Sequence, residues 1–140
     1  MLRLVLGWQA AQGVDWSRLF HAYAAATDTP GHLRALTGGD RDAQLAAFAH
    51  LDFAVLHQGT VYSVTPVAVR VVAGLLCEEA LRRPGHDGTV LLPQVLAFLG
   101  WAADSAAAAP ISARTMMRAV HFDPRRRSSF GEPLKGPRDR

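Results

Sequence analysis

The sequence of 140 residues has one cysteine, one lysine and no long hydrophobic run. Because Cys77 is the single cysteine, an internal disulfide is excluded, and its place in the largely apolar segment 71–81 predicts a small buried side chain. No window of about 18 uncharged apolar residues occurs, so we expect no membrane span. Residues 1–6 lack the pattern of an export signal, and we therefore expect a cytoplasmic protein.

Net positive charge is confined to the last residues of the sequence. Residues 125–140 carry a net charge of +4 and the whole chain carries +3, so residues 1–124 sum to −1. Such a body offers no excess of positive charge to hold a phosphate backbone. Arg125, Arg126 and Arg127 are candidate partner-binding residues for an acidic protein surface, a nucleic acid or an anionic lipid, and a solvated terminus is the alternative.

Hydrophobic periodicity predicts an all-α fold of five or six helices. No segment alternates with a period of two, and no Asn-Gly hairpin turn occurs. Apolar residues recur at helical spacing instead. These stripes cover residues 16–24, 33–36, 45–55, 67–82, 90–103 and 111–120. Short connections between such helices favour antiparallel pairs, the arrangement of a short α-solenoid.

Polar residues and prolines mark the expected helix starts. Asp15 and Asp40 are predicted N-caps. Thr29-Pro30 and Thr65-Pro66 each have the pattern of a cap followed by proline at the first helical position. We divide the chain into a helical repeat-like domain, 1–123, and a basic Arg-, Pro- and Gly-rich tail, 124–140, for which we expect an extended or mobile chain.

The same stripes predict whether individual side chains are buried or exposed. We expect Trp16 and Tyr23 in the core. Leu45 belongs to a buried stripe, and Gln44 is expected on the solvent-exposed face of the same helix. Residues 106–110 are expected to be a spacer after the helix 90–103.

A resemblance to a known family is carried by residues 15–76. The residues concerned are Asp15-Trp16 with Leu19, His21-Ala22-Tyr23, Asp28-Thr29-Pro30, Leu33-Arg34-Ala35-Leu36, Asp40, the loop His57-Gln58-Gly59-Thr60-Val61-Tyr62-Ser63, and Thr65-Pro66. In these positions the chain resembles HEAT-repeat-like proteins common in actinobacteria. The resemblance implies a solenoid of helix pairs, protein interaction and, in some relatives, an immunity-like or scaffolding role. It implies no reaction.

No arrangement of residues along the sequence predicts a metal, a cofactor or a catalytic group. No two of the six histidines are three or four residues apart, the spacing at which one helix holds a metal ion. Ser63, His57 and Asp52 are the residue types of a hydrolytic set, but no Gly-x-Ser-x-Gly elbow is present. The residues therefore favour a non-enzymatic protein and leave the question of an enzyme open.

The loop 57–63 is the best single site in the sequence. His57, Gln58, Thr60 and Tyr62 are candidate partner-binding residues, and the alternative is a loop whose side chains satisfy backbone groups at helix ends. The favoured function is a protein-protein interaction module, as an immunity, accessory or scaffold subunit. Two alternatives stay open: a HEAT-like nucleic-acid-binding protein, and a small-molecule-binding or catalytic domain with a pocket between helices.

Overall fold

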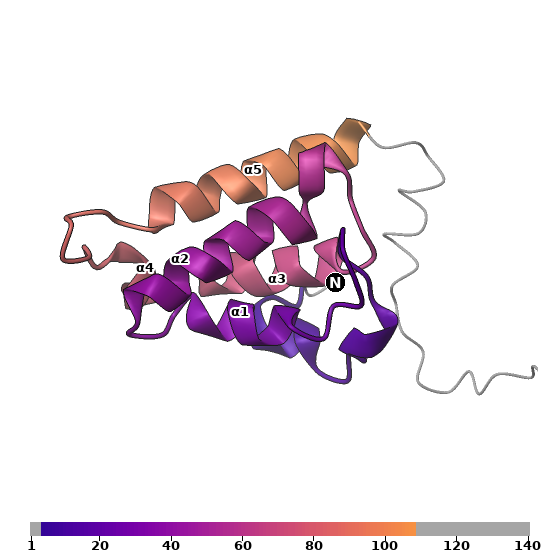
Figure 1. Ribbon diagram of the computed structural model, residues 1–140, viewed down its shortest axis with the longest axis horizontal. Coiled ribbons are helices and arrows are strands. Elements are labelled where there is room, and N and C mark those ends of the chain that lie inside the picture. The colour runs from indigo at the N-terminus through magenta and orange to yellow at the C-terminus, as the bar shows by residue number, and fades with distance from the viewer. Residues whose placement is uncertain (1–3, 109–140) are drawn as a thin grey trace, which may run out of the picture.

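A computed structural model describes residues 4–108, which form a helical body (Figure 1). Its α-helices are α1 (Thr29–Ala35), α2 (Arg41–His50), α3 (Thr65–Leu75), α4 (Glu79–Arg82) and α5 (Leu92–Ala108). Four shorter turns accompany them: η1 (Gly7–Ala11), η2 (Trp16–Arg18), the π-helical η3 (Leu51–Val55) and η4 (His57–Gly59). The described part contains one isolated bridge pairing and no strand, which confirms the all-α prediction for these residues. The expected helix 111–120 and the tail 124–140 lie outside the described residues.

Helices α1 and α2 form an antiparallel pair. Asp40 caps α2 as predicted, because its side chain accepts hydrogen bonds from the amides of Asp42 and Ala43. Thr29, the first residue of α1, contacts His50, the last residue of α2. The end of α1 meets the start of α2 through two polar contacts of Gln44, described below. Polar contacts at both ends thus fix the pair.

Helix α3 lies at the centre of the body and is apolar on most of its surface. Val67 is buried, and Ala68, Val71, Val72 and Leu75 join one core cluster with residues of α1, α2 and α5. Dense β-branched residues would also suit a strand, but the helix buries these side chains on several sides at once. Helix α5 runs in the opposite direction to α3 (Figure 1). Among residues 4–108, no helix is both long enough and apolar enough to span a bilayer.

The turn η1 crosses α3 at a pair of glycines. A Cβ atom on Gly74 would lie 2.1 Å from the backbone nitrogen of Gly7. Glycine is a poor residue for a helix interior, yet only glycine allows two backbones to approach this closely. The crossing therefore fixes the path of the N-terminal segment over the central helix.

The segment 16–24 is not the predicted helix, because it bonds to other segments instead of to itself. After η2 it forms a tight hairpin with a bridge between Phe20 and Ala25. The Phe20 amide donates to Ser63 Oγ at 2.8 Å, and the Ala22 amide donates to the Ala54 carbonyl at 3.0 Å. These partners replace the bonds that a helix would have made. As a result Tyr23, predicted in the core, has an exposed side chain.

Three further predictions are wrong for local reasons. Gln44 is buried and Leu45 exposed, the reverse of the prediction, because the Gln44 amide donates to the Leu36 and Gly38 carbonyls at 3.1 and 2.9 Å. Cys77 is exposed, since α3 ends two residues before it. Helix α5 continues to Ala108, through part of the predicted spacer, because its run of alanines favours helix.

Candidate functional site

Three histidines and an aspartate gather where the hairpin meets the α1–α2 pair. His21 belongs to the hairpin, Asp28 precedes α1, His32 lies in α1 and His50 ends α2. One donor atom from each of His21, Asp28 and His50 lies within 4.8 Å of the others. We call His21, Asp28 and His50 the histidine cluster. Its members come from three segments, which is why the spacing of residues along one helix did not reveal it.

His21 is held in one orientation by two polar contacts. Its Nδ1 atom accepts a hydrogen bond from the Tyr23 amide at 3.2 Å, so the proton of the neutral ring resides on Nε2. Nε2 then donates to Asp28 Oδ1 at 3.1 Å. The His21 side chain is buried, whereas the Asp28 side chain is 52% exposed. The cluster is therefore open to solvent on the side of its carboxylate.

His50 presents its other ring nitrogen to the same carboxylate. Its Nε2 atom lies 2.9 Å from Thr29 Oγ1, and its Nδ1 atom lies 4.0 Å from Asp28 Oδ2. The His32 ring stacks on it with centroids 4.2 Å apart. A proton on Nε2 makes a hydrogen bond to the threonine oxygen and leaves the Nδ1 electron pair facing Asp28.

Burial and neighbouring charge set the ionisation of the cluster. Burial first, and then the nearby His32, lowers the pKa of His50 from 6.5 to about 4, so His50 is neutral at pH 7. Burial alone would raise the pKa of Asp28, but His50 and the hydrogen bond from His21 outweigh it and lower that pKa. Asp28 is therefore ionised at neutral pH, where its carboxylate accepts the hydrogen bond from His21.

The order Thr29, His50, Asp28 matches a hydroxyl-imidazole-carboxylate triad only in residue type. Thr29 is fully buried, so its hydroxyl cannot reach a substrate. The His50 nitrogen is also 4.0 Å from the carboxylate, too far for the hydrogen bond that orients a catalytic base. Two imidazoles and a carboxylate are better suited to holding a cation.

Exposed aromatic residues surround η3 and η4 beside this cluster. Phe20, Tyr23, Phe53 and Trp101 are 55%, 68%, 62% and 39% exposed, and we call these four residues the aromatic end. His57 Nδ1 donates to the Phe53 carbonyl at 2.9 Å and lies 3.3 Å from the Tyr23 hydroxyl. Phe20 is tied to the loop through Ser63, and a Cβ on Gly59 would lie 3.9 Å from the Trp101 ring nitrogen. These contacts bring together residues from the hairpin, η3 and α5.

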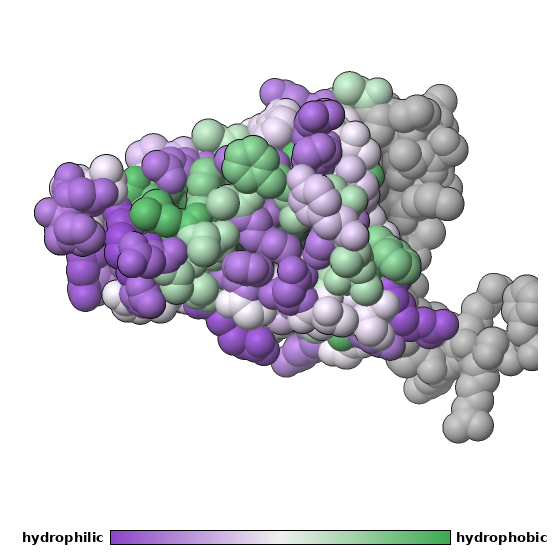
Figure 2. Space-filling model, viewed as in Figure 1, coloured by the Kyte–Doolittle hydropathy of each residue, from purple (hydrophilic) through white to green (hydrophobic). Residues whose placement is uncertain are grey.

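Apolar exposure also continues over the helical face next to the aromatic end. Figure 2 shows apolar residues in green among hydrophilic ones over the α2 and α5 side of the molecule. Leu45 of α2 and Leu96 of α5 are exposed large hydrophobic residues.

The predicted loop residues divide into two groups. Gln58 and Thr60 are exposed, and Gln58 has a φ of 50°. Tyr62 packs partly buried against the core, and its amide donates to Thr65 Oγ1 at 2.9 Å. His57 and Tyr62 thus hold the loop in place, in keeping with the structural alternative, whereas Gln58 and Thr60 face outward. Arg125, Arg126 and Arg127 lie outside the described residues.

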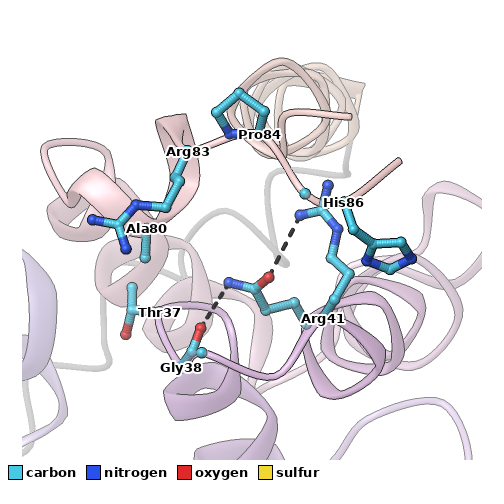
Figure 3. A pocket seen from close by; sticks show the side chains of 10 residues that line it. Thr37, Gly38, Arg41, Ala80, Arg83, Pro84 and His86 are labelled. Carbon is cyan, nitrogen blue, oxygen red and sulfur yellow. Dashed lines mark hydrogen bonds between the residues drawn. The ribbon is translucent and has the colours of Figure 1, made fainter. Parts of the chain in front are cut away.

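A pocket of about 360 Å³ lies at the opposite end of α2 (Figure 3). It is lined by Thr37, Gly38, Arg41, Arg83, Pro84 and His86 with their neighbours. Arg41 is 11% exposed, donates to the Thr89 carbonyl and hydroxyl, and lies 3.7 Å from Asp87. Arg83 extends away from Arg41 and pairs with Glu79 at 2.8 Å (Figure 3). The two guanidinium groups therefore do not converge on one ligand.

No protein-family model, curated protein or solved structure matches this chain. The resemblance to HEAT-repeat-like proteins accordingly stays a prediction.

Proposed function

We propose that this chain is a non-enzymatic protein-interaction domain that binds a partner protein through its aromatic end. In this proposal the α1–α2 and α3–α5 pairs are HEAT-like repeats, and the domain acts as an immunity, accessory or scaffold subunit. The observation that carries the proposal is the gathering of exposed aromatic residues around η3 and η4.

Exposed aromatic side chains are costly unless something covers them. Phe20, Tyr23 and Phe53 each leave more than half of their surface in water. Clustered exposed apolar surface is typical of binding sites, and Tyr and Trp are enriched among the residues that dominate binding energy. Aromatic rings also lose little conformational entropy on binding, since two torsion angles fix them.

The surroundings of the aromatic end fit the usual layout of an interface. Gln58 and Thr60 are exposed polar residues on the adjoining loop and would form part of a polar rim. The His57 contacts to Phe53 and Tyr23 hold both residues in place before a partner arrives. Such preorganisation reduces the entropy that binding must overcome.

Site-specific photocrosslinking in the source cells tests this proposal. A photoreactive phenylalanine analogue is placed at Phe53 or Tyr23, and at His86 on the opposite end as a matched exposed control. We expect the same single protein adduct from both aromatic positions and none from position 86. Equal adducts from all three positions would contradict the proposal.

Once the crosslinked partner is purified, the affinity of this chain and its variants for that partner can be measured. Phe53→Ser and Tyr23→Ser should each weaken binding at least about tenfold, the effect of losing a residue that dominates an interface. His86→Ser should leave the affinity unchanged. Because all three side chains are exposed, each variant should keep its free energy of unfolding within about 0.5 kcal/mol. Unchanged affinity in both aromatic variants would place the interface elsewhere.

A further inference from the structure

We propose that His21, Asp28 and His50 form a binding site for one divalent transition-metal ion of the zinc type. The site is independent of the proposed protein interaction, because it rests on the histidine cluster alone. Two imidazole nitrogens and one carboxylate oxygen would hold the ion, and the exposed side of Asp28 leaves a further position for water.

The spacing of the donor atoms fits such an ion. Zinc binds nitrogen and oxygen at about 2.0–2.2 Å, which places neighbouring ligands of a tetrahedron roughly 3.3 Å apart. His21 Nε2 lies 3.1 Å from Asp28 Oδ1, and His50 Nδ1 lies 4.0 Å from Asp28 Oδ2. All three donors lie within 4.8 Å of one another. Bringing the farthest pair from at most 4.8 Å to about 3.3 Å requires a combined shift of at most about 1.5 Å.

His50 is already arranged as a ligand. The Thr29 hydroxyl lies 2.9 Å from Nε2 and can accept its proton, which directs the Nδ1 electron pair toward Asp28. A hydrogen bond from the far nitrogen is the usual way in which a metal-binding histidine is oriented.

His21 must change its tautomer for the metal to bind. Its Nε2 atom now carries the proton that Asp28 accepts, and Nδ1 accepts the Tyr23 amide. When Nε2 gives its electron pair to the metal, the ring proton moves to Nδ1, and no net proton is released. Once Nδ1 carries a hydrogen it can no longer accept one, so the hydrogen bond from the Tyr23 amide to Nδ1 must break. Metal binding should therefore displace the backbone at Tyr23.

The donor set selects the class of metal. Imidazole suits zinc and its neighbours, whereas calcium and magnesium prefer all-oxygen sites. The half-exposed carboxylate of Asp28 offers a path from solvent and one negative charge to attract the cation.

Zinc titration of the tag-free full chain, stripped with a chelator, tests the site. Calorimetry with zinc chloride should show one ion per chain. Asp28→Asn and His50→Gln should weaken binding at least about tenfold, and His86→Gln, an exposed histidine outside the cluster, should bind as the unchanged chain does. Circular dichroism checks that each variant is folded. Asp28→Asn is the more reliable of the two variants, because asparagine is similar in size to aspartate and the side chain at this position is half exposed.

Nuclear magnetic resonance locates the ion without any variant. In a 15N-labelled chain, one equivalent of zinc should shift the Tyr23 amide and the ring nitrogens of His21 and His50, and magnesium should shift none of them. No stoichiometric binding at micromolar protein, or binding that Asp28→Asn leaves intact, would overturn the proposal. So would a Tyr23 amide that does not respond to bound zinc.

Discussion

The two ends of α2 each carry a polar anchor, and the anchors differ in the chemistry they leave unpaired: at the first residue it is the buried Nε–H donor of Arg41. At the first residue, Arg41 bonds Thr89, faces Asp87 and reaches Gln44. At the last residue, His50 has Thr29 on one nitrogen and the carboxylate of Asp28 4.0 Å from the other. The first anchor directs its charge into the fold, and the second places a ring nitrogen of His50 opposite a half-exposed carboxylate.

This difference separates a structural cluster from a binding cluster. Both ends bring charged or titratable groups from distant segments together, and both adjoin a loop. Only at the His50 end do electron-pair donors converge, and only there do exposed aromatic residues gather in the described part of the chain. An unpaired N–H such as Arg41 Nε cannot bind a cation, so close polar contacts are evidence for a metal ion only where electron-pair donors converge.

Arg41→Ala should show the largest effect on stability. The change removes a nearly buried guanidinium from Thr89 and Asp87, so we expect a loss of about 2 kcal/mol in the free energy of unfolding. Urea unfolding followed by tryptophan fluorescence measures it. Zinc affinity should not change. Arg83→Ala, at an exposed ion pair with Glu79, is the matched control and should leave the urea midpoint unchanged.

Thr29→Val should have a smaller effect on stability and a specific effect on the metal. The variant keeps the shape of a buried side chain but removes the hydroxyl beside His50, which should cost about 1 kcal/mol. Zinc binding should weaken by about tenfold, since His50 loses the contact that orients it. Calorimetry on the folded variant measures the affinity. If Arg41→Ala weakened zinc binding as much as Thr29→Val, the contrast between the two ends would fail.

Asp87→Asn should have the smallest effect, and that effect should depend on pH. Hydrogen bonds from the Thr89 hydroxyl and amide, with help from Arg41, hold the pKa of Asp87 below its usual 3.8. A lowered pKa in the folded state stabilises the fold above the usual pKa, and this stabilisation is lost as the pH falls through the folded value. The urea midpoint of the variant should therefore be slightly lower at pH 7, and the difference between the two midpoints should be smaller at pH 3 than at pH 7. An equal difference at both pH values would contradict this assignment.

Local chemistry made much of the helical body predictable. Asp40 caps α2 as expected, and Pro66 followed by Val67, Val71 and Leu75 correctly marks α3. The hairpin at Phe20–Ala25 could not be predicted in this way. Its apolar spacing fits a helix, but its backbone bonds go to Ser63 and Ala54, partners that only the folded chain supplies.

The candidate sites depend on contacts across the chain. His21, Asp28 and His50 are separated by up to 29 positions, so no spacing rule for one helix could bring them together. The aromatic end was missed for a related reason: the same wrong helix placed Tyr23 in the core. The loop 57–63 was found because its polar residues stand out locally, and the structure places part of the aromatic end against it.

The wide turn at η3 makes the direction of the aromatic surface sensitive to chain length. The Leu56 amide donates to the Leu51 carbonyl at 3.1 Å, five residues back instead of four. Such a turn contains one residue more than an ordinary helix turn. Removing one residue there would restore an ordinary helix turn and change which side chains of the turn face outward, so that Phe53 or its neighbours would point to another side. Natural variants with a one-residue gap at this point should therefore differ in partner choice while keeping the same core.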